Sequence, residues 1–135
     1  MASEVLVVDE TPSLGGSVVS LLEADGLAVR RFADLHGAES YHSGAGGSHP
    51  VVVVASNAHY CPSASRWALG ALRDAHLVVV GTRDPALRSA GRLHVVRLPL
   101  EPAGFLELVR ALLGNSTDST ARSASLPPTG TQPTT

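Results

Sequence analysis

The chain has 135 residues, of which 44% are hydrophobic, and this favours one domain with a real core and argues against wholesale disorder. The formal net charge of −2 gives no general attraction to nucleic acid or membranes, and a single cysteine, Cys61, excludes an internal disulfide framework. All ten basic residues are arginine, which excludes the lysine-dependent P-loop and Schiff-base chemistries.

The N-terminal residues MASEVLVV have no basic region followed by a long apolar stretch, and no apolar run reaches the length of a membrane span. We therefore expect a soluble, cytoplasmic protein that does not bind membranes. The bias towards arginine, alanine and glycine is typical of a GC-rich genome such as that of an actinobacterium.

The first elements are a strand, a helix and a second strand. Residues 5–8 are apolar and β-branched, which is typical of a strand buried on both faces of a parallel sheet. Thr11 and Pro12 have the residue types of a helix N-cap and first helical position, and Asp25-Gly26 predicts the helix end. Residues 27–32 then read as a strand.

The middle of the chain begins with a weak helix over residues 33–43 and a flexible glycine-rich loop over 43–48. Residues 51–55 form the most strongly predicted strand. A helix over residues 63–74 follows, and its apolar positions predict a buried face. That face contains Trp67, Ala68, Ala71 and Leu72.

The last elements are strands over residues 77–80 and 95–98, with a short helix near 85–90 between them. A final amphipathic helix begins near Pro102 and is predicted to end at Gly114. We divide the chain into a domain of residues 1–114 and a disordered Ser/Thr/Pro-rich tail or linker of residues 115–135, because the tail has almost no large apolar residue.

Strands that alternate with helices predict an α/β fold with a doubly wound parallel sheet. In such sheets, ligands bind at the carboxyl ends of the strands. The residues at these ends are Asp9, Glu10, Ser56, Asn57, Gly81, Thr82 and Leu98.

Four segments resemble the receiver domain of two-component response regulators. They are VLVVDETPSLGGSVVSLLEADGLAV, HPVVVVASN, VVVGTRDP and RLPLEPAGFLELVRALLG, and the resemblance spans about residues 4–114. It implies a flavodoxin-like (CheY-like) fold, with a five-stranded parallel sheet in the order 2-1-3-4-5 and helices on both faces.

The resemblance also implies where a phosphorylation site would lie. Asp9 and Glu10 match the acidic pair that holds Mg²⁺ in receivers, whereas Ser56 stands at the position of the phosphorylated aspartate. The switch hydroxyl position falls on Gly81 or Thr82, and Leu98 replaces the lysine before proline. An acyl phosphate requires a carboxylate nucleophile, so the chain resembles an atypical pseudo-receiver with a degenerate metal site and no cofactor.

Several readings of individual residues remain open. Ser56 either caps the loop backbone or is a target of phosphorylation or a ligand contact, and the capping interpretation is favoured. Asp9 and Glu10 either bind a cation or form a solvated strand end. A zinc site would need His42, His49, His59 and Cys61 in a pattern that their spacing does not provide, and a Ser56–His59 hydrolase pair lacks an orienting acid.

Arginines dominate residues 83–97, which in receivers belong to the helix 4–strand 5–helix 5 output face. They are Arg83, Arg88, Arg92 and Arg97. We predict a non-enzymatic signalling module that acts by contact with a protein partner or by homodimerisation through this face, without direct nucleic-acid binding. It could be the regulatory domain of a response regulator. The alternative is a sensor that binds a small molecule in the former phosphorylation pocket.

Overall fold

The computed structural model describes residues 4–45 and 49–125, with side chains described for residues 4–44 and 49–114. Strands and helices alternate over most of its length. In chain order the elements are β1 (Glu4–Asp9), α1 (Pro12–Ala24), β2 (Ala28–Phe32), α2 (Leu35–Ala45), β3 (Val51–Ala55), α3 (Pro62–Leu69), β4 (His76–Val80), β5 (Leu93–Val96) and α4 (Pro102–Ser125).

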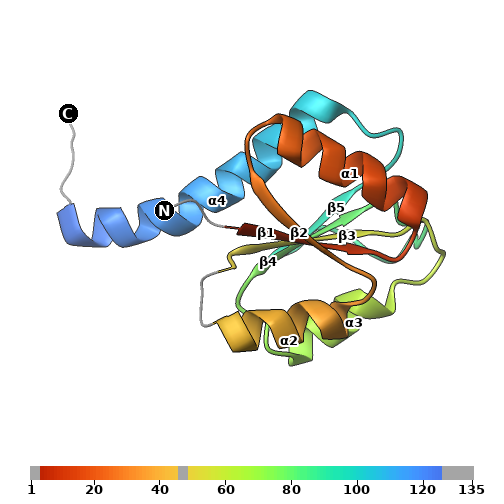
Figure 1. Ribbon diagram of the computed structural model, residues 1–135, viewed down its shortest axis with the longest axis horizontal. Helices are drawn as coiled ribbons and strands as arrows, with labels where there is room; N and C mark the ends of the chain where they lie inside the picture. The colour runs from red at the N-terminus through yellow and green to blue at the C-terminus, as the bar shows by residue number, and fades with distance from the viewer. Residues whose placement is uncertain (1–3, 46–48, 126–135) are drawn as a thin grey trace.

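The five strands form one parallel sheet in the order β2-β1-β3-β4-β5, which confirms the predicted fold class. Helices α1 and α4 cover one face of this sheet, and α2 and α3 cover the other (Figure 1). Reversal of the winding direction at β1 places α1 and α2 on opposite sides, as expected for a doubly wound sheet.

The central strands are buried on both faces, because their side chains alternate between two cores. Val5 and Val7 pack with α1 and α4, whereas Leu6 and Val8 pack with α2 and α3. Trp67 is also in the second core, and its indole N–H donates to the carbonyl of Ala75 at 3.1 Å. The predicted burial of Trp67 is therefore confirmed.

Three local predictions are confirmed at residue level. Thr11 is the N-cap of α1 and Pro12 is its first residue, although no side-chain capping bond forms. Gly26 follows the helix with a φ of 84°, a conformation that glycine adopts without steric cost. The strand predicted over residues 51–55 has the predicted bounds.

The short helix predicted near residues 85–90 is absent, and the chain runs irregularly between β4 and β5. The side chain of Arg97 donates to the carbonyl oxygens of Thr82, Asp84 and Leu87 at 3.1, 3.0 and 2.6 Å. These carbonyl groups are therefore satisfied by a side chain rather than by helical N–H groups. The structure has no counterpart of the receiver's fourth helix in this segment.

The predicted fifth strand is displaced by two residues, to Leu93–Val96. Val80 pairs with Val96, and the bond from Gly81 N–H to the Val96 carbonyl closes the ladder. The chain then leaves the sheet at Arg97, whose side chain turns back to the preceding loop. Leu98 therefore lies outside the strand, before a cis peptide bond to Pro99.

Helix α3 is shorter than predicted and ends at Leu69, before Gly70. Residues 71–74 form turns, so the predicted helical face breaks up. Ala68 and Ala71 are exposed rather than buried, whereas Leu72 is buried as predicted.

Helices α2 and α4 extend further than predicted. Helix α2 runs to Ala45, so the predicted flexible loop is helical at its start, and residues 46–48 lie outside the described part. Helix α4 continues past Gly114 to Ser125, and no proline interrupts residues 103–125. Its distal half leads away from the sheet (Figure 1). The predicted disordered tail is thus helical over 115–125, and residues 126–135 lie outside the described part.

None of the helices in the described part of the chain combines the length and the apolar character that a membrane span requires.

Two half-buried histidines link the amino ends of β4 and β5. His76 Nδ1 lies 3.1 Å from His94 Nε2, and burial is the main cause that lowers the pKa of both imidazoles below 6.5. The unfolded chain therefore binds protons at a higher pH than the folded chain.

We expect the free energy of unfolding to fall as the pH decreases from about 7.5 to about 5.5, through the ordinary histidine range. Urea unfolding at both pH values measures this, and a His94→Gln variant should show a smaller decrease. Equal stability of the native chain at both values would contradict the prediction.

Candidate functional site

The carboxyl ends of β1, β3 and β4 lie at one edge of the sheet, which we call the carboxyl edge. Asp9 pairs with Ala55 in the strand register, and Ala55 pairs with Val80. Backbone bonds continue this pairing beyond the strands, from Thr11 N–H to the Ala55 carbonyl and from Ser56 N–H to the Val80 carbonyl, both at 3.0 Å. The structure thus brings the predicted strand-end residues together.

Asp9 is neutralised by an arginine of the same chain. Arg31, on the neighbouring strand β2, donates from Nε to Oδ2 of Asp9 and from a terminal nitrogen to the Pro12 carbonyl at 3.1 Å. The carboxylate of Asp9 is largely covered, with a side-chain exposure of 13%. A guanidinium of the same chain therefore compensates the charge of Asp9.

Glu10 is directed to a different partner. Its Oε2 accepts a hydrogen bond from the hydroxyl of Ser63, which lies in the first turn of α3 and is buried. The two adjacent carboxylates consequently diverge, one towards β2 and the other towards α3. The described part of the chain contains no group of three or more His, Cys, Asp or Glu residues that could hold a metal ion.

This donor set does not fit Mg²⁺. Magnesium prefers octahedral coordination by oxygen ligands, with one or two carboxylates available to it. Asp9 is already paired with a guanidinium, Glu10 with a hydroxyl, and Ser56 supplies no charge. The acidic pair predicted from the sequence is therefore present, but both of its carboxylates bind groups of this chain.

Ser56 is 1% exposed and uses its side chain locally. Its Oγ accepts a hydrogen bond from the backbone N–H of Ala58 at 3.4 Å. This bond supports the capping interpretation of the serine. The adjacent Asn57 pairs with Thr11, whose Oγ1 accepts from the Asn57 N–H at 3.1 Å and donates to the Asn57 side-chain carbonyl at 3.2 Å. The loop after β3 is thus tied to the start of α1.

The two switch-position residues are also built into the fold. Thr82 is 3% exposed, and its Oγ1 accepts from the backbone N–H of Asp84 at 3.1 Å. Gly81 has a φ of 90°, and a side chain there would meet Leu14 at 2.6 Å. Leu98, at the lysine position, is 48% exposed and offers no charge to the carboxyl edge.

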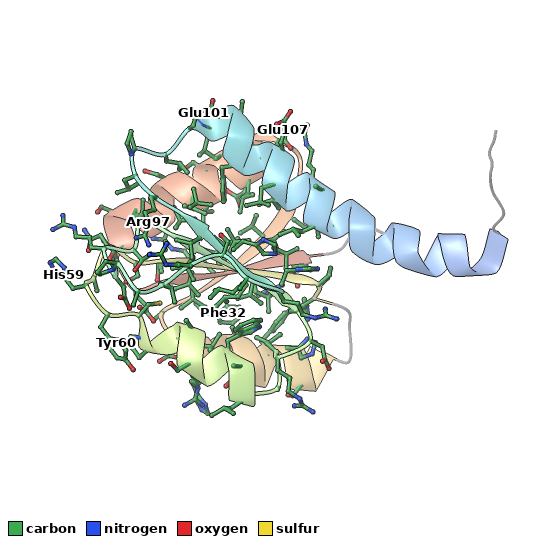
Figure 2. All side chains as sticks on the ribbon, turned by 180° about the vertical axis from the view of Figure 1, so that it is seen from behind. Phe32, His59, Tyr60, Arg97, Glu101 and Glu107 are labelled. Atoms are coloured by element: carbon green, nitrogen blue, oxygen red, sulfur yellow. The ribbon has the colours of Figure 1, made fainter. Side chains whose placement is uncertain are left out.

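The four residues considered for zinc are divided between the two edges of the sheet. His42 and His49 lie towards the amino ends of the strands, with their Nδ1 atoms 2.7 Å apart. His59 and Cys61 follow β3 at the carboxyl edge, where burial raises the pKa of the Cys61 thiol. Ser56 is buried, whereas His59 is exposed and projects outwards with Tyr60 (Figure 2). Neither the zinc set nor the hydrolase pair is assembled.

The four arginines of the predicted face fall into two groups, two that bind backbone carbonyls of this chain and two that do not. Arg92 donates to the Asp74 carbonyl at 2.5 Å, and Arg97 donates to three carbonyls of the loop before β5, so both have a structural role. Arg83 and Arg88 are exposed, and within the described residues their side chains make no hydrogen bond or ion pair. Of the four arginines, Arg83 and Arg88 are therefore the best placed to contact a partner through the whole guanidinium.

Arg31 is the site residue that sequence reasoning missed. The only sequence feature that pointed to Arg31 was its charge within the strand AVRRF, and a charge in a strand most often marks a solvent-exposed edge. Its contact with Asp9 depends on the β1–β2 register, in which Val7 pairs with Arg31 and Val8 pairs with Phe32. That register is not readable from either strand alone.

Comparison with solved structures identifies the fold. The chain is similar to the receiver domain of the sensor histidine kinase PA1611 from Pseudomonas aeruginosa PAO1, a structure with magnesium coordinated in its active-site cleft. The TM-score is 0.60 at 18% identity, over 84% of this chain and 99% of that one. It is also similar to a response regulator receiver protein from Burkholderia phymatum, with a TM-score of 0.59 and 23% identity, over 83% of this chain and 95% of that one.

No protein-family model matches the sequence. A comparison with curated proteins gives no match either. At these identities, the solved structures establish that the chain has the receiver fold.

Proposed function

We propose that this chain is an atypical receiver domain of the response regulator family that signals without accepting a phosphoryl group. In this proposal it works in the cytoplasm, has no enzymatic activity of its own, and acts by contact with another protein or with a second copy of itself. The receiver fold and the matched segments around Asp9, Ser56 and Leu98 support the family assignment.

One observation carries the proposal: the ion pair between Arg31 and Asp9 beside a buried serine. Transfer of a phosphoryl group to a receiver needs a carboxylate nucleophile and a cation that screens the charge of the incoming oxygens. Ser56 has no carboxylate, and its hydroxyl lies beneath its own loop. The guanidinium of Arg31 compensates the charge of Asp9 without a metal ion.

The carboxyl edge also supports a role in protein contact. Tyr60 and Leu98 are 64% and 48% exposed, and Arg83 is exposed near them. The Arg83 N–H donates to the Ala58 carbonyl at 3.0 Å, which joins the loop that carries Tyr60 to the loop after β4. Tyrosine and arginine are enriched among residues that dominate protein interfaces. An acidic surface would complement Arg83 and Arg88.

This location modifies the output face implied by the family resemblance. Because the fourth helix of receivers is missing here, the exposed arginines belong to the irregular loop between β4 and β5. The small-molecule alternative in the former phosphorylation pocket is less supported, since Asp9, Ser56 and Thr82 all use their polar side-chain atoms within the chain.

Intact-mass spectrometry tests the loss of phosphotransfer. The full chain is incubated with acetyl phosphate and Mg²⁺, and we expect its mass to remain unchanged because no carboxylate occupies the nucleophile position. An ordinary receiver treated in the same way serves as the positive control. A phosphoryl adduct that is lost on treatment with hydroxylamine, as acyl phosphates are, would refute the proposal.

A further inference from the structure

A pocket of about 310 Å³ lies between α2 and α3, on the sheet face opposite α1 and α4. It is lined by Glu39 of α2, by Arg66 and Leu69 of α3, and by Gly70. The residues at the carboxyl edge do not contribute to this lining. Its volume is at the lower end of the range for small-molecule sites.

The pocket contains a buried carboxylate with one unsatisfied oxygen. Glu39 is 8% exposed, and its Oε1 accepts a hydrogen bond from Nε of Arg66 at 3.2 Å. Its Oε2 is buried and makes no hydrogen bond to any described residue. A buried carboxylate oxygen without a donor is energetically costly, so a group that supplies a donor would bind favourably.

Gly70 explains how this oxygen comes to be covered without being bonded. A Cβ at position 70 would lie 1.9 Å from Oε2 of Glu39, so the carboxylate packs directly against the glycine backbone. The Gly70 N–H already donates to the Trp67 carbonyl at 3.2 Å. A ligand would reach Oε2 if the carboxylate turned about the last side-chain bond of Glu39, a torsion with a broad preference, and this movement would also release the guanidinium of Arg66 for the ligand.

The other walls supply a cation and an apolar surface. The Arg66 side chain is 54% exposed, and one of its terminal nitrogens lies 3.2 Å from Nδ1 of His36. Leu69 is 86% exposed, although it is a large apolar residue. A carboxylate, a guanidinium and an exposed leucine therefore line one small pocket.

We propose that this pocket binds a free α-amino acid with an apolar side chain. The ligand's ammonium group would donate to Glu39, its carboxylate would accept from the guanidinium of Arg66, and its side chain would cover Leu69. Opposite charges at the two ends of the ligand match the two charges of the pocket, whereas a simple cation would be repelled by Arg66 and a simple anion by Glu39. This site does not depend on the proposed loss of phosphorylation.

Fluorescence of the single tryptophan, Trp67, provides the readout. Trp67 lies in α3 between pocket residues, and its backbone carbonyl accepts a hydrogen bond from the N–H of Gly70, which lines the pocket. The full chain is titrated with L-leucine, L-isoleucine, L-valine, L-methionine and L-phenylalanine. We expect a saturable change with at least one of them. The derivatives of that amino acid that lack a charge, the N-acetyl form and the amide, should each bind about tenfold more weakly or worse, since each loses a charge-assisted contact.

Two variants test the assigned contacts. Glu39→Gln and Arg66→Gln should each raise the dissociation constant about tenfold or more, whereas Glu107→Gln, on the exposed face of α4, should leave it unchanged. Circular dichroism checks that each variant is folded. If Glu39→Gln is unstable, the Arg66→Gln variant alone tests the proposal, because the Arg66 side chain is exposed. Absence of a saturable response to all five amino acids, or binding that neither variant weakens, would overturn the proposal.

Discussion

Replacing Ser56 with aspartate is expected to lower the free energy of unfolding by about 3 kcal/mol or more, the scale for an unpaired buried charge. The new carboxylate would stand at a position that is 1% exposed, beside Asp9 and Glu10. Arg31 is already bound to Asp9, and the Arg97 side chain is already bound to carbonyls of the loop after β4. The introduced aspartate therefore adds a buried charge at an edge where the bonded arginines already have partners.

The matched control for this substitution is Ser56→Ala. It removes only the weak bond to the Ala58 N–H and should cost about 0.5–1.5 kcal/mol. Denaturant unfolding measures both variants. Burial raises the pKa of the introduced carboxyl, so its destabilising effect is complete above that raised pKa and decreases as the pH falls through it. A Ser56→Asp chain as stable as the native chain at neutral pH would show that a free cation or an open space is available at this edge.

Alanine at Gly15 is expected to destabilise the chain by about 1–3 kcal/mol, with displacement of α1 from β1. A Cβ at Gly15 would lie 2.1 Å from the Cβ of Asp9 and 3.1 Å from its Cα, so backbone would have to move. That movement would also disturb the ion pair of Asp9 with Arg31. Glycine at this position is what allows α1 to cross directly over the acidic residue.

The adjacent Gly16 provides a stringent control. A Cβ there would meet only a terminal nitrogen of Arg31, at 3.8 Å, which is ordinary contact. Because alanine favours the helix interior over glycine, Gly16→Ala should stabilise the chain by about 0.5–1 kcal/mol. The two substitutions thus have opposite expected signs in the same helix. Urea unfolding of both variants checks this, and equal effects at the two positions would contradict the close packing of α1 on Asp9.

The sequence predicted best what local patterns determine. Apolar β-branched runs at residues 5–8 and 51–55 are sufficient to identify central parallel strands, and the Thr11-Pro12 pair marks the start of α1. Since carboxyl ends of neighbouring parallel strands meet at one edge, the strand-end residues could also be assigned to one place. Ser56 was placed correctly at the end of β3 in this way, whereas Leu98 lies beyond the end of β5.

Features that depend on contacts between distant segments were predicted poorly. Where a helix was predicted between β4 and β5, the Arg97 side chain instead satisfies carbonyls 10 to 15 residues away. The role of Arg31 depends on the β1–β2 register, and the orphan oxygen of Glu39 on the approach of α3.

The central claim is that a guanidinium of the chain itself replaces the metal cation at Asp9. A titration of the isotope-labelled chain with Mg²⁺, followed through the backbone amide resonances of Asp9, Glu10 and Ser56, tests it most directly. Because Arg31 already compensates Asp9, the amide resonances should show no saturable shift. Saturable shifts confined to these three residues would contradict the claim, since they would demonstrate a functional magnesium site at the carboxyl edge.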